Sequence, residues 1–219
     1  MLLLSFILSL LAGYLLGSIP TGFLVARARG IDIRTVGSGN IGATNALRIL
    51  GKGPGSLVLL IDAAKGYLAC MGIPWLLSQW GFLSPILTGG THEWLKIAAG
   101  FSAVLGHNYT CWLEFKGGKG IATSAGVLLG WVPAALGIIF LVFVAVFAVS
   151  RYVSLASIAA ALALPFATWL TGGSGSLVAI TTLLSTLAIF KHRSNIQRLL
   201  AGTETRIGGK KPMVGGHTP

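Results

Sequence analysis

The feature that most constrains this chain is a set of long segments that contain no charged residue. Segment 1–26 is uncharged up to Arg27, and segments 121–150 and 152–190 are uncharged throughout. A helix of about 20 apolar residues is long enough to cross the hydrocarbon core of a bilayer. Segment 1–26 is also too long for the apolar core of a cleavable signal peptide. We therefore predict an all-α integral membrane protein.

The composition excludes other common classes of protein. Hydrophobic residues make up 54% of the 219 residues and charged residues only 10%, and the mean hydropathy is +0.82. A soluble domain carries roughly 25% charged residues, so an ordinary cytosolic enzyme is excluded. Cys70 and Cys111 both lie in apolar segments, and we interpret them as small buried hydrophobic residues without a disulfide.

The number of spans depends on how segment 121–150 crosses the membrane. Segments 54–77 and 95–113 are one candidate span each, and a glycine-rich turn at 172–175 divides segment 152–190 into two spans. Segment 121–150 either crosses once as a tilted helix or folds back at its Trp-Val-Pro sequence as two shorter helices. Length alone does not separate these alternatives.

The distribution of basic residues decides between them. The chain has 16 Lys and Arg against five Asp and Glu, a net charge of +11. All basic residues except Lys65 and Lys96 lie in four places, namely 27–52, 116–119, Arg151 and 191–211. Cytoplasmic loops are enriched in Lys and Arg, and only a fold-back near Pro133 puts all four places on that side. We therefore predict a bundle of about seven transmembrane helices, several of them short, with a periplasmic N-terminus and a cytoplasmic C-terminus.

The chain is expected to have one domain and a tail. We predict a single transmembrane domain over residues 1–204, because no internal repeat is visible in it. Residues 205–219 are polar, glycine-rich and basic, and we predict that they form a flexible tail.

The first motif is the sequence VGSGNIGATN (36–45), followed by Arg48. Its glycines match the dinucleotide-binding pattern G-x-G-x-x-G, but that fold requires a preceding buried strand, and here a membrane helix precedes the motif. Glycines still let backbone N–H groups surround a phosphate, and the side chains add donors. The alternative is a flexible loop without a ligand. The candidate residues are Gly37, Ser38, Gly39, Asn40, Gly42, Thr44, Asn45 and Arg48.

The second motif is the sequence FKGGKGIAT (115–123), preceded by His107. It does not match a Walker A loop, but it places glycines and a lysine at the start of a short helix predicted to begin near Gly120. Helix N-termini attract anions. The alternative is that Lys116 and Lys119 are topological anchors, which suits Lys116 better, and that His107 is a polar residue at a helix end. The candidate residues are His107, Gly117, Gly118, Lys119 and Gly120.

The third motif is the sequence HRSNIQRLL (192–200), followed by Gly202 and Glu204. Helical spacing puts His192, Asn195 and Leu199 on one face. The alternative is a basic helix next to the membrane that is attracted to anionic lipid, which suits Lys191 and Arg193 better.

Two further features accompany the motifs. Ser154 and Ser157 lie in a short cytoplasmic turn, 151–157, from which their hydroxyl groups can reach a bound anion. Asp62 and Lys65 are one helical turn apart inside a span. Ionisable residues within the membrane are functional candidates by default, and a structural ion pair is the equal alternative.

Several chemistries are excluded by missing residues. The chain has only two aspartates, Asp32 and Asp62, so it lacks the carboxylate cluster that holds Mg²⁺. No His is followed by Asp five residues later, as in a common acyltransferase dyad, and no G-x-S-x-G sequence occurs. We expect neither a metal or other cofactor nor a nucleic-acid partner.

Together the motifs resemble those of one family, the bacterial acyl-phosphate:glycerol-3-phosphate acyltransferases of PlsY type. The resemblance extends over residues 13–204 and also includes GSIP (17–20), DAAKG (62–66) and RYVSLAS (151–157). It implies a seven-span helical bundle in the bacterial inner membrane, with the lipid bilayer around it and the active site facing the cytoplasm. It also implies transfer of a fatty acyl group from acyl-phosphate to glycerol 3-phosphate. The products would be 1-acyl-glycerol 3-phosphate (lysophosphatidic acid) and phosphate, at the first step of phospholipid synthesis.

The resemblance and the residue types together suggest roles in binding the phosphates. We expect Ser38 and the backbone of 37–42 to hold one phosphate. Arg48 and Lys119 neutralise charge on the acyl-phosphate and on the departing phosphate. A soluble or peripheral enzyme that produces acyl-phosphate is a possible partner.

Other residues are expected to serve the acceptor. His192 and Asn195 orient glycerol 3-phosphate, and Ser154 and Ser157 help. For this family the acceptor's own phosphate has been proposed to take the hydroxyl proton. The scarcity of carboxylates in this chain agrees with that proposal. The alternative is that His192 or His107 acts as the base. The candidate catalytic residues are thus Ser38, Arg48, Lys119, His192 and Asn195, and the other candidates bind substrate.

Two other functions compete with this hypothesis. A transporter of organic phosphates would place its substrate near the membrane midplane, often between repeats, whereas here the basic groups gather on one side and no repeat is visible. A non-catalytic lipid-binding scaffold would not need three separate motifs of Gly, Asn and Lys.

Overall fold

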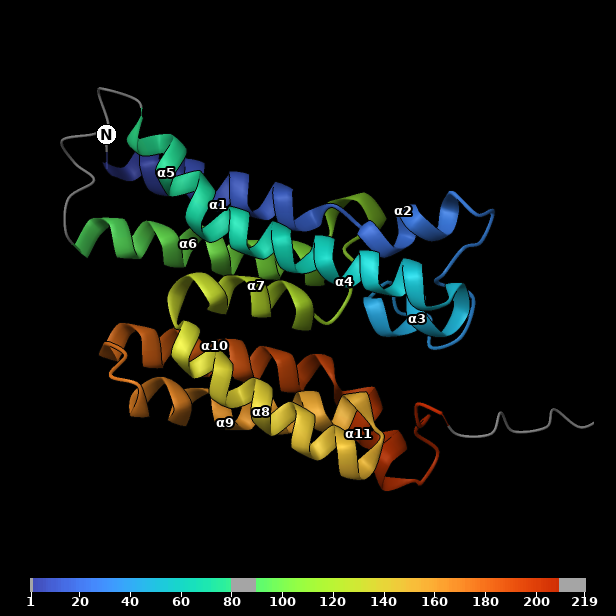
Figure 1. Ribbon diagram of the computed structural model, residues 1–219. Coiled ribbons are helices and arrows are strands. Elements are labelled where there is room, and N and C mark those ends of the chain that lie inside the picture. Colours follow the sequence, from blue (N-terminus) through green and yellow to red (C-terminus); the bar gives the residue numbers. More distant parts are fainter. Residues whose placement is uncertain (1, 80–89, 209–219) are drawn as a thin grey trace, which may run out of the picture.

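The computed structural model describes residues 2–79 and 90–208, and every regular element in these residues is helical (Figure 1). The predicted all-α class is confirmed. The long helices are α1 (Leu2–Ser18), α4 (Lys52–Tyr67), α6 (Gly90–Asn108), α7 (Ile121–Trp131), α8 (Pro133–Ser150), α9 (Val153–Leu170) and α10 (Gly175–Lys191). The shorter elements are α2 (Thr21–Arg27), α3 (Ala43–Leu50), a π-helical turn (Leu68–Gly72), α5 (Ile73–Ser78), a 3₁₀ turn (Cys111–Leu113) and α11 (Arg193–Leu200).

The long helices alternate in direction and form an antiparallel bundle. Helices α1, α6, α8 and α10 run toward the end of the bundle where α2, α3 and α11 lie, and α4, α7 and α9 run away from it (Figure 1). Segment 121–150 therefore folds back, as predicted. Val132 leaves the helical conformation (φ −144°, ψ 64°), and Pro133 begins α8 at a position where its missing N–H costs no helical hydrogen bond.

The helices differ in their capacity to cross a membrane unaided. Within the described residues, four stretches are long and apolar enough, 2–27, 52–78, 133–150 and 153–170. The bent pair α10–α11, with 56° between its helices, is a fifth if it counts as one span. Helix α7 has 11 residues, so it is about 16 Å long, which is shorter than the hydrocarbon core. The bundle thus includes short helices, as predicted.

Two predicted spans differ from the structure in detail. The first reaches Arg27 but is interrupted at Pro20, between α1 and α2, because proline has no N–H to donate into a continuing helix. The third ends at Asn108 instead of Leu113, and Thr110 caps the following 3₁₀ turn. Residues 109–120 are consequently available as a loop at the basic end of the bundle.

Glycines allow neighbouring helices to pack at close range. A Cβ atom at Gly17 of α1 would lie 2.0 Å from the carbonyl oxygen of Ala103 in α6. At Gly126 of α7 it would lie 1.8 Å from the carbonyl oxygen of Ala63 in α4. Backbone-to-backbone packing through small residues is typical of membrane helices. This requirement accounts for part of the high glycine content, 31 residues.

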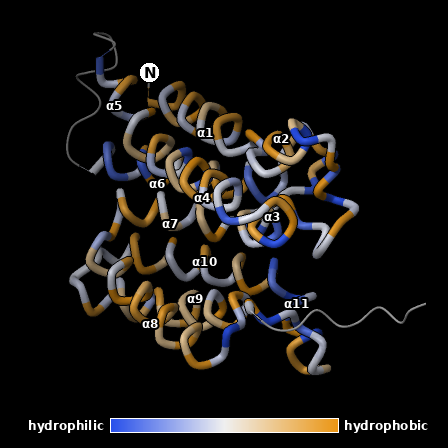
Figure 2. The backbone as a smooth tube through the Cα atoms, turned by 45° about the vertical axis from the view of Figure 1, so that its right-hand side comes forward, coloured by the Kyte–Doolittle hydropathy of each residue, from blue (hydrophilic) through white to orange (hydrophobic). Residues whose placement is uncertain are grey.

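Polar and apolar residues are separated along the bundle. Hydrophobic residues cover the middle, and hydrophilic stretches gather above all at the end with α2, α3 and α11 (Figure 2). Large hydrophobic side chains on the outer faces, such as Leu141, Phe166 and Trp169, are exposed. In a membrane these side chains contact lipid. The hydrophilic end is where the sequence motifs meet.

Candidate active site

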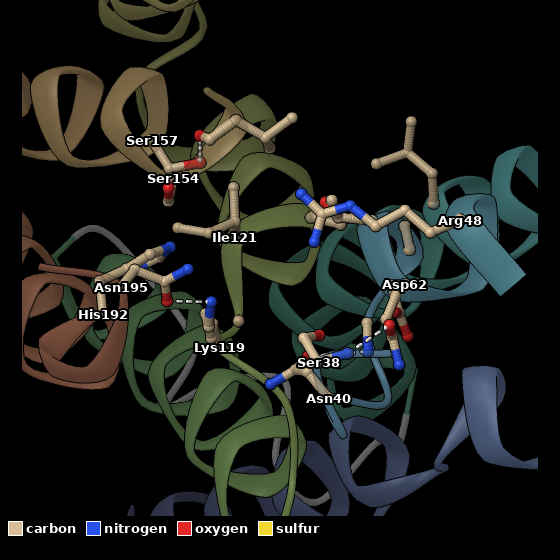
Figure 3. A pocket seen from close by; sticks show the side chains of 18 of the residues that line it. Ser38, Asn40, Arg48, Asp62, Lys119, Ile121, Ser154, Ser157, His192 and Asn195 are labelled. Atoms are coloured by element: carbon tan, nitrogen blue, oxygen red, sulfur yellow. Dashed lines mark hydrogen bonds between the residues drawn. The ribbon is translucent and has the colours of Figure 1, made fainter. Parts of the chain in front are cut away.

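A cavity opens at the hydrophilic end, between α3, α4, the starts of α7 and α9, and the α10–α11 junction (Figure 3). Its volume is about 160 Å³, below the range of roughly 300–1,000 Å³ that drug-sized ligands occupy. The cavity therefore suits a small polar molecule or head group. Part of its wall is apolar and consists of Leu59, Ile121 and Phe143.

The fold brings most of the predicted site residues together around this cavity. Those that line it come from all three motifs and from the start of α9: Ser38, Asn40, Gly42, Thr44, Asn45, Arg48, His107, Lys119, Gly120, Ser154, Ser157, His192 and Asn195. The expected turn over 151–157 is wrong in its extent, because α9 begins at Val153 and carries both serines. Figure 3 shows Arg48 reaching in from one side, His192 and Asn195 from the opposite side, and Lys119 between them. The predicted residues that do not line it are Gly37, Gly39, Gly117 and Gly118.

The loop before α3 is held together by the side chain of Asn45. Its Oδ1 accepts a hydrogen bond from the Ser38 N–H at 3.0 Å, and its Nδ2 donates to the carbonyls of Ile33 (3.3 Å) and Val36 (3.1 Å). Both amide hydrogens are thus used within the loop, and Asn45 shapes the site instead of offering a donor to an anion. Gly37 has φ +61°, and a Cβ there would lie 2.4 Å from Asn45 Oδ1.

Some backbone N–H groups of this loop are also already paired. The Gly42 N–H donates to Asn40 Oδ1 at 2.9 Å, and the Gly39 N–H donates to the Val36 carbonyl at 3.1 Å. The first N–H groups of α3 have no partner within the helix, and Ala43 and Thr44 at this helix start line the cavity. An anion would meet the start of α3 and the Ser38 side chain.

The glycines of the second motif pack against α6. The Gly118 N–H donates to the His107 carbonyl at 2.9 Å, and a Cβ at Gly118 would lie 2.1 Å from His107 Nε2. The Gly117 N–H donates to the Asn108 carbonyl at 3.2 Å, which also accepts from Lys191 Nζ at 2.9 Å. These glycines therefore let the loop turn tightly and present the next residue, Lys119, to the cavity.

The two lysines of this loop have opposite surroundings. Lys116 is 80% exposed and pairs at 3.1 Å with Glu114, which is equally exposed. Lys119 is half-buried, and its Nζ donates to Asn195 Oδ1. Burial lowers the pKa of Lys119 to about 8; neighbouring cations act in the same direction, and Glu204 opposes them.

Glu204 organises the opposite side of the cavity, and the sequence reasoning did not select it as a site residue. Its Oε1 accepts from Ser154 Oγ (2.9 Å) and Asn195 Nδ2 (2.8 Å), and its Oε2 accepts from Arg198 Nε (2.7 Å). Burial raises the pKa of Glu204, but these three donors outweigh it and hold the pKa below its usual value. The scarcity of carboxylates could have pointed to Glu204, because the chain has only five Asp and Glu residues.

Asp62 also lines the cavity, at the level of the membrane span. Its Oδ1 lies 2.9 Å from Lys65 Nζ and 3.6 Å from His107 Nδ1, and Lys65 Nζ also donates to the Ile19 carbonyl at 2.8 Å. All three ionisable side chains are buried. The ion pair therefore connects α4 to α6 and to the α1–α2 break, and Asp62 borders the cavity at the same time.

The cavity contains two cations whose protein partners are neutral. Arg48 Nη2 donates to the Thr205 carbonyl at 3.1 Å, and Arg48 Nε is buried without a partner. Lys119 contacts the amide oxygen of Asn195. Nearby, His192 Nδ1 lies 2.7 Å from the Ala188 carbonyl, which requires the hydrogen on Nδ1 and leaves Nε2 as the basic nitrogen. Such an arrangement binds anions.

The residues that follow Glu204 are attached to the bundle. Thr205 and Ile207, expected at the start of the flexible tail, are attached to the bundle through hydrogen bonds with Arg48 and Arg151, whereas 209–219 lie outside the described residues. Within 2–79 and 90–208, no group of three or more His, Cys, Asp and Glu side chains is placed to hold a metal ion.

The bundle and its cavity define an integral membrane protein with a cationic cavity at one end of its helices. The chain belongs to the glycerol-3-phosphate acyltransferase family, whose sequence model matches residues 7–202. It is therefore an acyltransferase, and the predicted resemblance is confirmed.

Individual relatives agree over nearly the whole chain. The glycerol-3-phosphate acyltransferase of Thermosynechococcus vestitus is 50% identical over 210 residues, covering 94% of this chain and 97% of its own. That of Geotalea daltonii is 46% identical, covering 90% and 95%. A crystal structure of PlsY (YgiH), an integral membrane glycerol 3-phosphate acyltransferase in its glycerol 3-phosphate form, has a TM-score of 0.81 and 38% identity, covering 93% of this chain and 96% of its own. A second structure, in the lysophosphatidic acid form, has a TM-score of 0.77 and 37% identity.

Proposed function

We propose that this protein transfers a fatty acyl group from acyl-phosphate to glycerol 3-phosphate. The products are 1-acyl-glycerol 3-phosphate and inorganic phosphate. The observation that carries the proposal is the pair of cavity cations, Arg48 and Lys119, which have only neutral protein partners. Both substrates are phosphates, and phosphate oxygens are the partners these cations lack. The apolar wall at Leu59, Ile121 and Phe143 suits the start of an acyl chain.

Each side of the cavity has its own task in this reaction. Ser38 and the start of α3 hold one phosphate, next to Arg48. Lys119 stabilises the charge that develops on the departing phosphate. Buried and preorganised cations are effective in this role because they need no rearrangement during the reaction.

The opposite side receives the acceptor. Asn195 and His192 orient glycerol 3-phosphate, and Ser154 and Ser157 border the same space. The glycerol hydroxyl oxygen attacks the acyl carbonyl carbon, a new ester C–O bond forms, and the C–O bond to phosphate breaks. The hydroxyl proton must leave during this step.

The surroundings of the carboxylates bear on where that proton goes. Glu204 already accepts three hydrogen bonds, and Asp62 is paired with Lys65. Neither is a free base. This supports proton transfer to the acceptor's own phosphate, with His192 Nε2 as the second candidate. His107 is less suitable, because a buried ion pair adjoins its ring.

Location and orientation are part of the proposal. We place the protein in the bacterial inner membrane, with the cavity facing the cytoplasm and the N-terminus in the periplasm, because the basic segments lie at the cavity end. A soluble or peripheral enzyme that makes acyl-phosphate would then reach the cavity directly. Residues 1–204 act as one transmembrane domain.

Cysteine labelling tests this orientation. Single cysteines replace Thr35, Glu114 and Ser194 in a protein from which Cys70 and Cys111 have been removed. All three should react with a membrane-impermeant reagent only after the cytoplasmic side is opened. Labelling of position 194 in intact cells would overturn the proposed orientation.

A reconstituted assay tests the reaction itself. Purified protein in liposomes receives acyl-phosphate and labelled glycerol 3-phosphate, and the expected products are labelled lysophosphatidic acid and an equal amount of phosphate. Acyl-CoA as donor should give no product. Uptake of label into the liposomes without acylation would instead favour an organic-phosphate transporter.

A further inference from the structure

The chain turns back over the cavity after its last helix. Helix α11 ends at Leu200, and Gly202 adopts the left-handed conformation (φ +68°) that commonly ends a helix. The N–H groups of Thr203 (2.8 Å) and Glu204 (3.2 Å) then both donate to the Arg198 carbonyl. Residues 203–207, called the strap below, are thereby directed back toward the bundle.

The strap is attached to both sides of the cavity. The Thr205 carbonyl accepts from Arg48 Nη2 at 3.1 Å, on the α3 side. The Ile207 N–H donates to the Arg151 carbonyl at 3.0 Å, on the α8–α9 turn. The strap therefore joins segments that lie far apart in the sequence.

Two side chains of the strap make further attachments. The Glu204 carboxylate accepts from Asn195 and Ser154 and lines the cavity. The Arg206 guanidinium lies 4.9 Å from the ring centroid of Tyr152, within the range of a cation–π contact. The strap is thus held in place by groups outside the cavity, while two of its residues face groups inside it.

The contact with Thr205 fixes the orientation of the Arg48 side chain but leaves its positive charge unpaired. A guanidinium has five N–H donors in a rigid plane, and a carbonyl that takes one of them fixes the plane without neutralising its charge. Arg48 Nε is buried and has no partner. The remaining donors are therefore available for an anion in the cavity.

We propose that the strap is a positioning element of the acyl-transfer site. Thr205 sets the orientation of Arg48 on the phosphate-binding side, and Glu204 sets that of Asn195 on the acceptor side. The strap consequently fixes the spacing between the two sides. This inference rests on the proposed function and concerns the same site.

Two substitutions at one position test it. Ile207→Pro removes the N–H that donates to Arg151, whereas Ile207→Ala shortens the side chain further but keeps that N–H, so the loss of side chain alone is tested by the alanine variant. Ile207→Pro should lower kcat/KM for glycerol 3-phosphate about tenfold, mainly through KM, because small misplacements of binding groups are costly. Ile207→Ala should remain within about twofold of the wild type, because the half-buried side chain is shortened but the hydrogen bond that attaches the strap is kept. Equal activity of the two variants would overturn the proposal.

Coupling to Arg48 separates positioning from a general structural effect. In an Arg48→Gln protein the strap has no guanidinium to orient, so Ile207→Pro should cost less there than in the wild type, and only the part of the loss that passes through Glu204 and Asn195 should remain. Coupled residues give such non-additive losses, and independent ones do not. The thermal midpoint in detergent should be the same for both Ile207 variants. Fully additive losses would contradict the proposal.

If Ile207→Pro does not accumulate in membranes, a second pair of variants tests the positioning role of the strap. Arg206→Ala removes the cation from the Tyr152 ring, and Arg206→Lys keeps one. The first should raise KM for glycerol 3-phosphate and the second should restore it. Equal values would overturn the role of the strap. A wild-type protein without acyl-phosphate-dependent activity would instead refute the proposed function itself.

Discussion

Two groups of charged side chains lie close together in this protein, and they differ in how their charges are balanced. The inner cluster consists of Asp62, Lys65 and His107, on α4 and α6. Asp62 Oδ1 lies 2.9 Å from Lys65 Nζ, so one negative charge meets one positive charge. Each of the three side chains is at most 5% exposed. The inner cluster is neutral within itself and joins helices.

The cavity cluster consists of Arg48, Lys119, Arg198 and Glu204. Here one carboxylate faces three cations, and it pairs directly with Arg198 at 2.7 Å. The other two cations contact only the oxygens of a side-chain amide and a backbone carbonyl. This cluster is therefore positive until an anion binds.

In this protein the balance of charge, more than its presence, separates structural from functional groups. Buried pairs that match one to one tolerate a low dielectric, whereas an unmatched buried cation is costly without a counter-ion. The inner cluster needs nothing further, and the cavity cluster needs a substrate. Substitutions in either cluster should therefore have different effects, on stability for the inner cluster and on activity for the cavity cluster.

The largest effect is expected from unbalancing the inner cluster. Lys65→Met leaves the Asp62 carboxylate buried without its cation, and breaking one partner of such a pair costs about 3–5 kcal/mol of stability. The thermal midpoint in detergent should fall sharply. The double variant Asp62→Asn with Lys65→Met should recover much of the loss, because it restores neutrality.

A surface pair provides the control. Lys116→Met breaks the exposed contact with Glu114, and exposed pairs contribute at most about 1 kcal/mol. Its thermal midpoint should stay close to that of the wild type. A Lys65→Met protein that is equally stable would show that the inner cluster has no structural role.

The next largest effect concerns catalysis by the cavity cluster. Lys119→Gln removes the cation proposed to stabilise the departing phosphate, and loss of one such group typically lowers kcat by about 10²–10³. Lys119→Arg should rescue poorly, because a planar fork does not replace a point charge in this tight turn. Activity with acyl-phosphate is measured at equal membrane abundance.

Lys116→Gln is the matched control for that experiment. It lies three residues earlier in the same loop but points into solvent, so it should lose far less activity. Equal activities of the two Gln variants would refute the role given to Lys119.

A smaller effect is expected from pH. Because burial lowers the pKa of Lys119 to about 8, its charge is present below that pH and is lost above it. The kcat/KM of the free enzyme should therefore be constant near pH 7 and fall by up to tenfold per unit above about pH 8. Lys119→Arg stays charged throughout this range, so its lower activity should show no such decline. A wild-type profile that is flat to pH 10 would contradict the proposal.

The sequence was sufficient for the architecture because membrane insertion leaves clear signals. Uncharged segments marked the helices, and the basic clusters together with Pro133 indicated the fold-back that the structure shows. The break at Pro20 was not predicted, although proline carries a local reason for it. The α6 boundary at Asn108 was missed because the sequence has no Lys, Arg, Asp or Glu between Lys96 and Glu114, and the absence of charge does not reveal a turn.

The site was predicted less completely, because residue type does not reveal where a donor points. Asn45 and Gly118 are residue types expected in phosphate loops, but each holds its own loop in shape: Asn45 borders the cavity with both amide hydrogens already used, and Gly118 does not line it. Glu204 was not selected because its partner Ser154 lies 50 residues away in sequence. The Thr205 contact with Arg48 spans 157 residues and uses a backbone carbonyl, which no sequence pattern marks.

The smallest effect is expected at Ser38, which contributes a neutral donor to the cavity cluster. Ser38→Ala should raise KM without unfolding the protein, because one neutral hydrogen bond is worth about 0.5–1.5 kcal/mol, or about twofold to tenfold in kcat/KM. Thr35→Ala is the control, since the Thr35 hydroxyl donates at 2.9 Å to the Asp32 carbonyl and Thr35 does not line the cavity. The assay uses glycerol 3-phosphate well below KM. If Ser38→Ala and Thr35→Ala both match the wild type, the phosphate is held by Arg48 and the start of α3 alone.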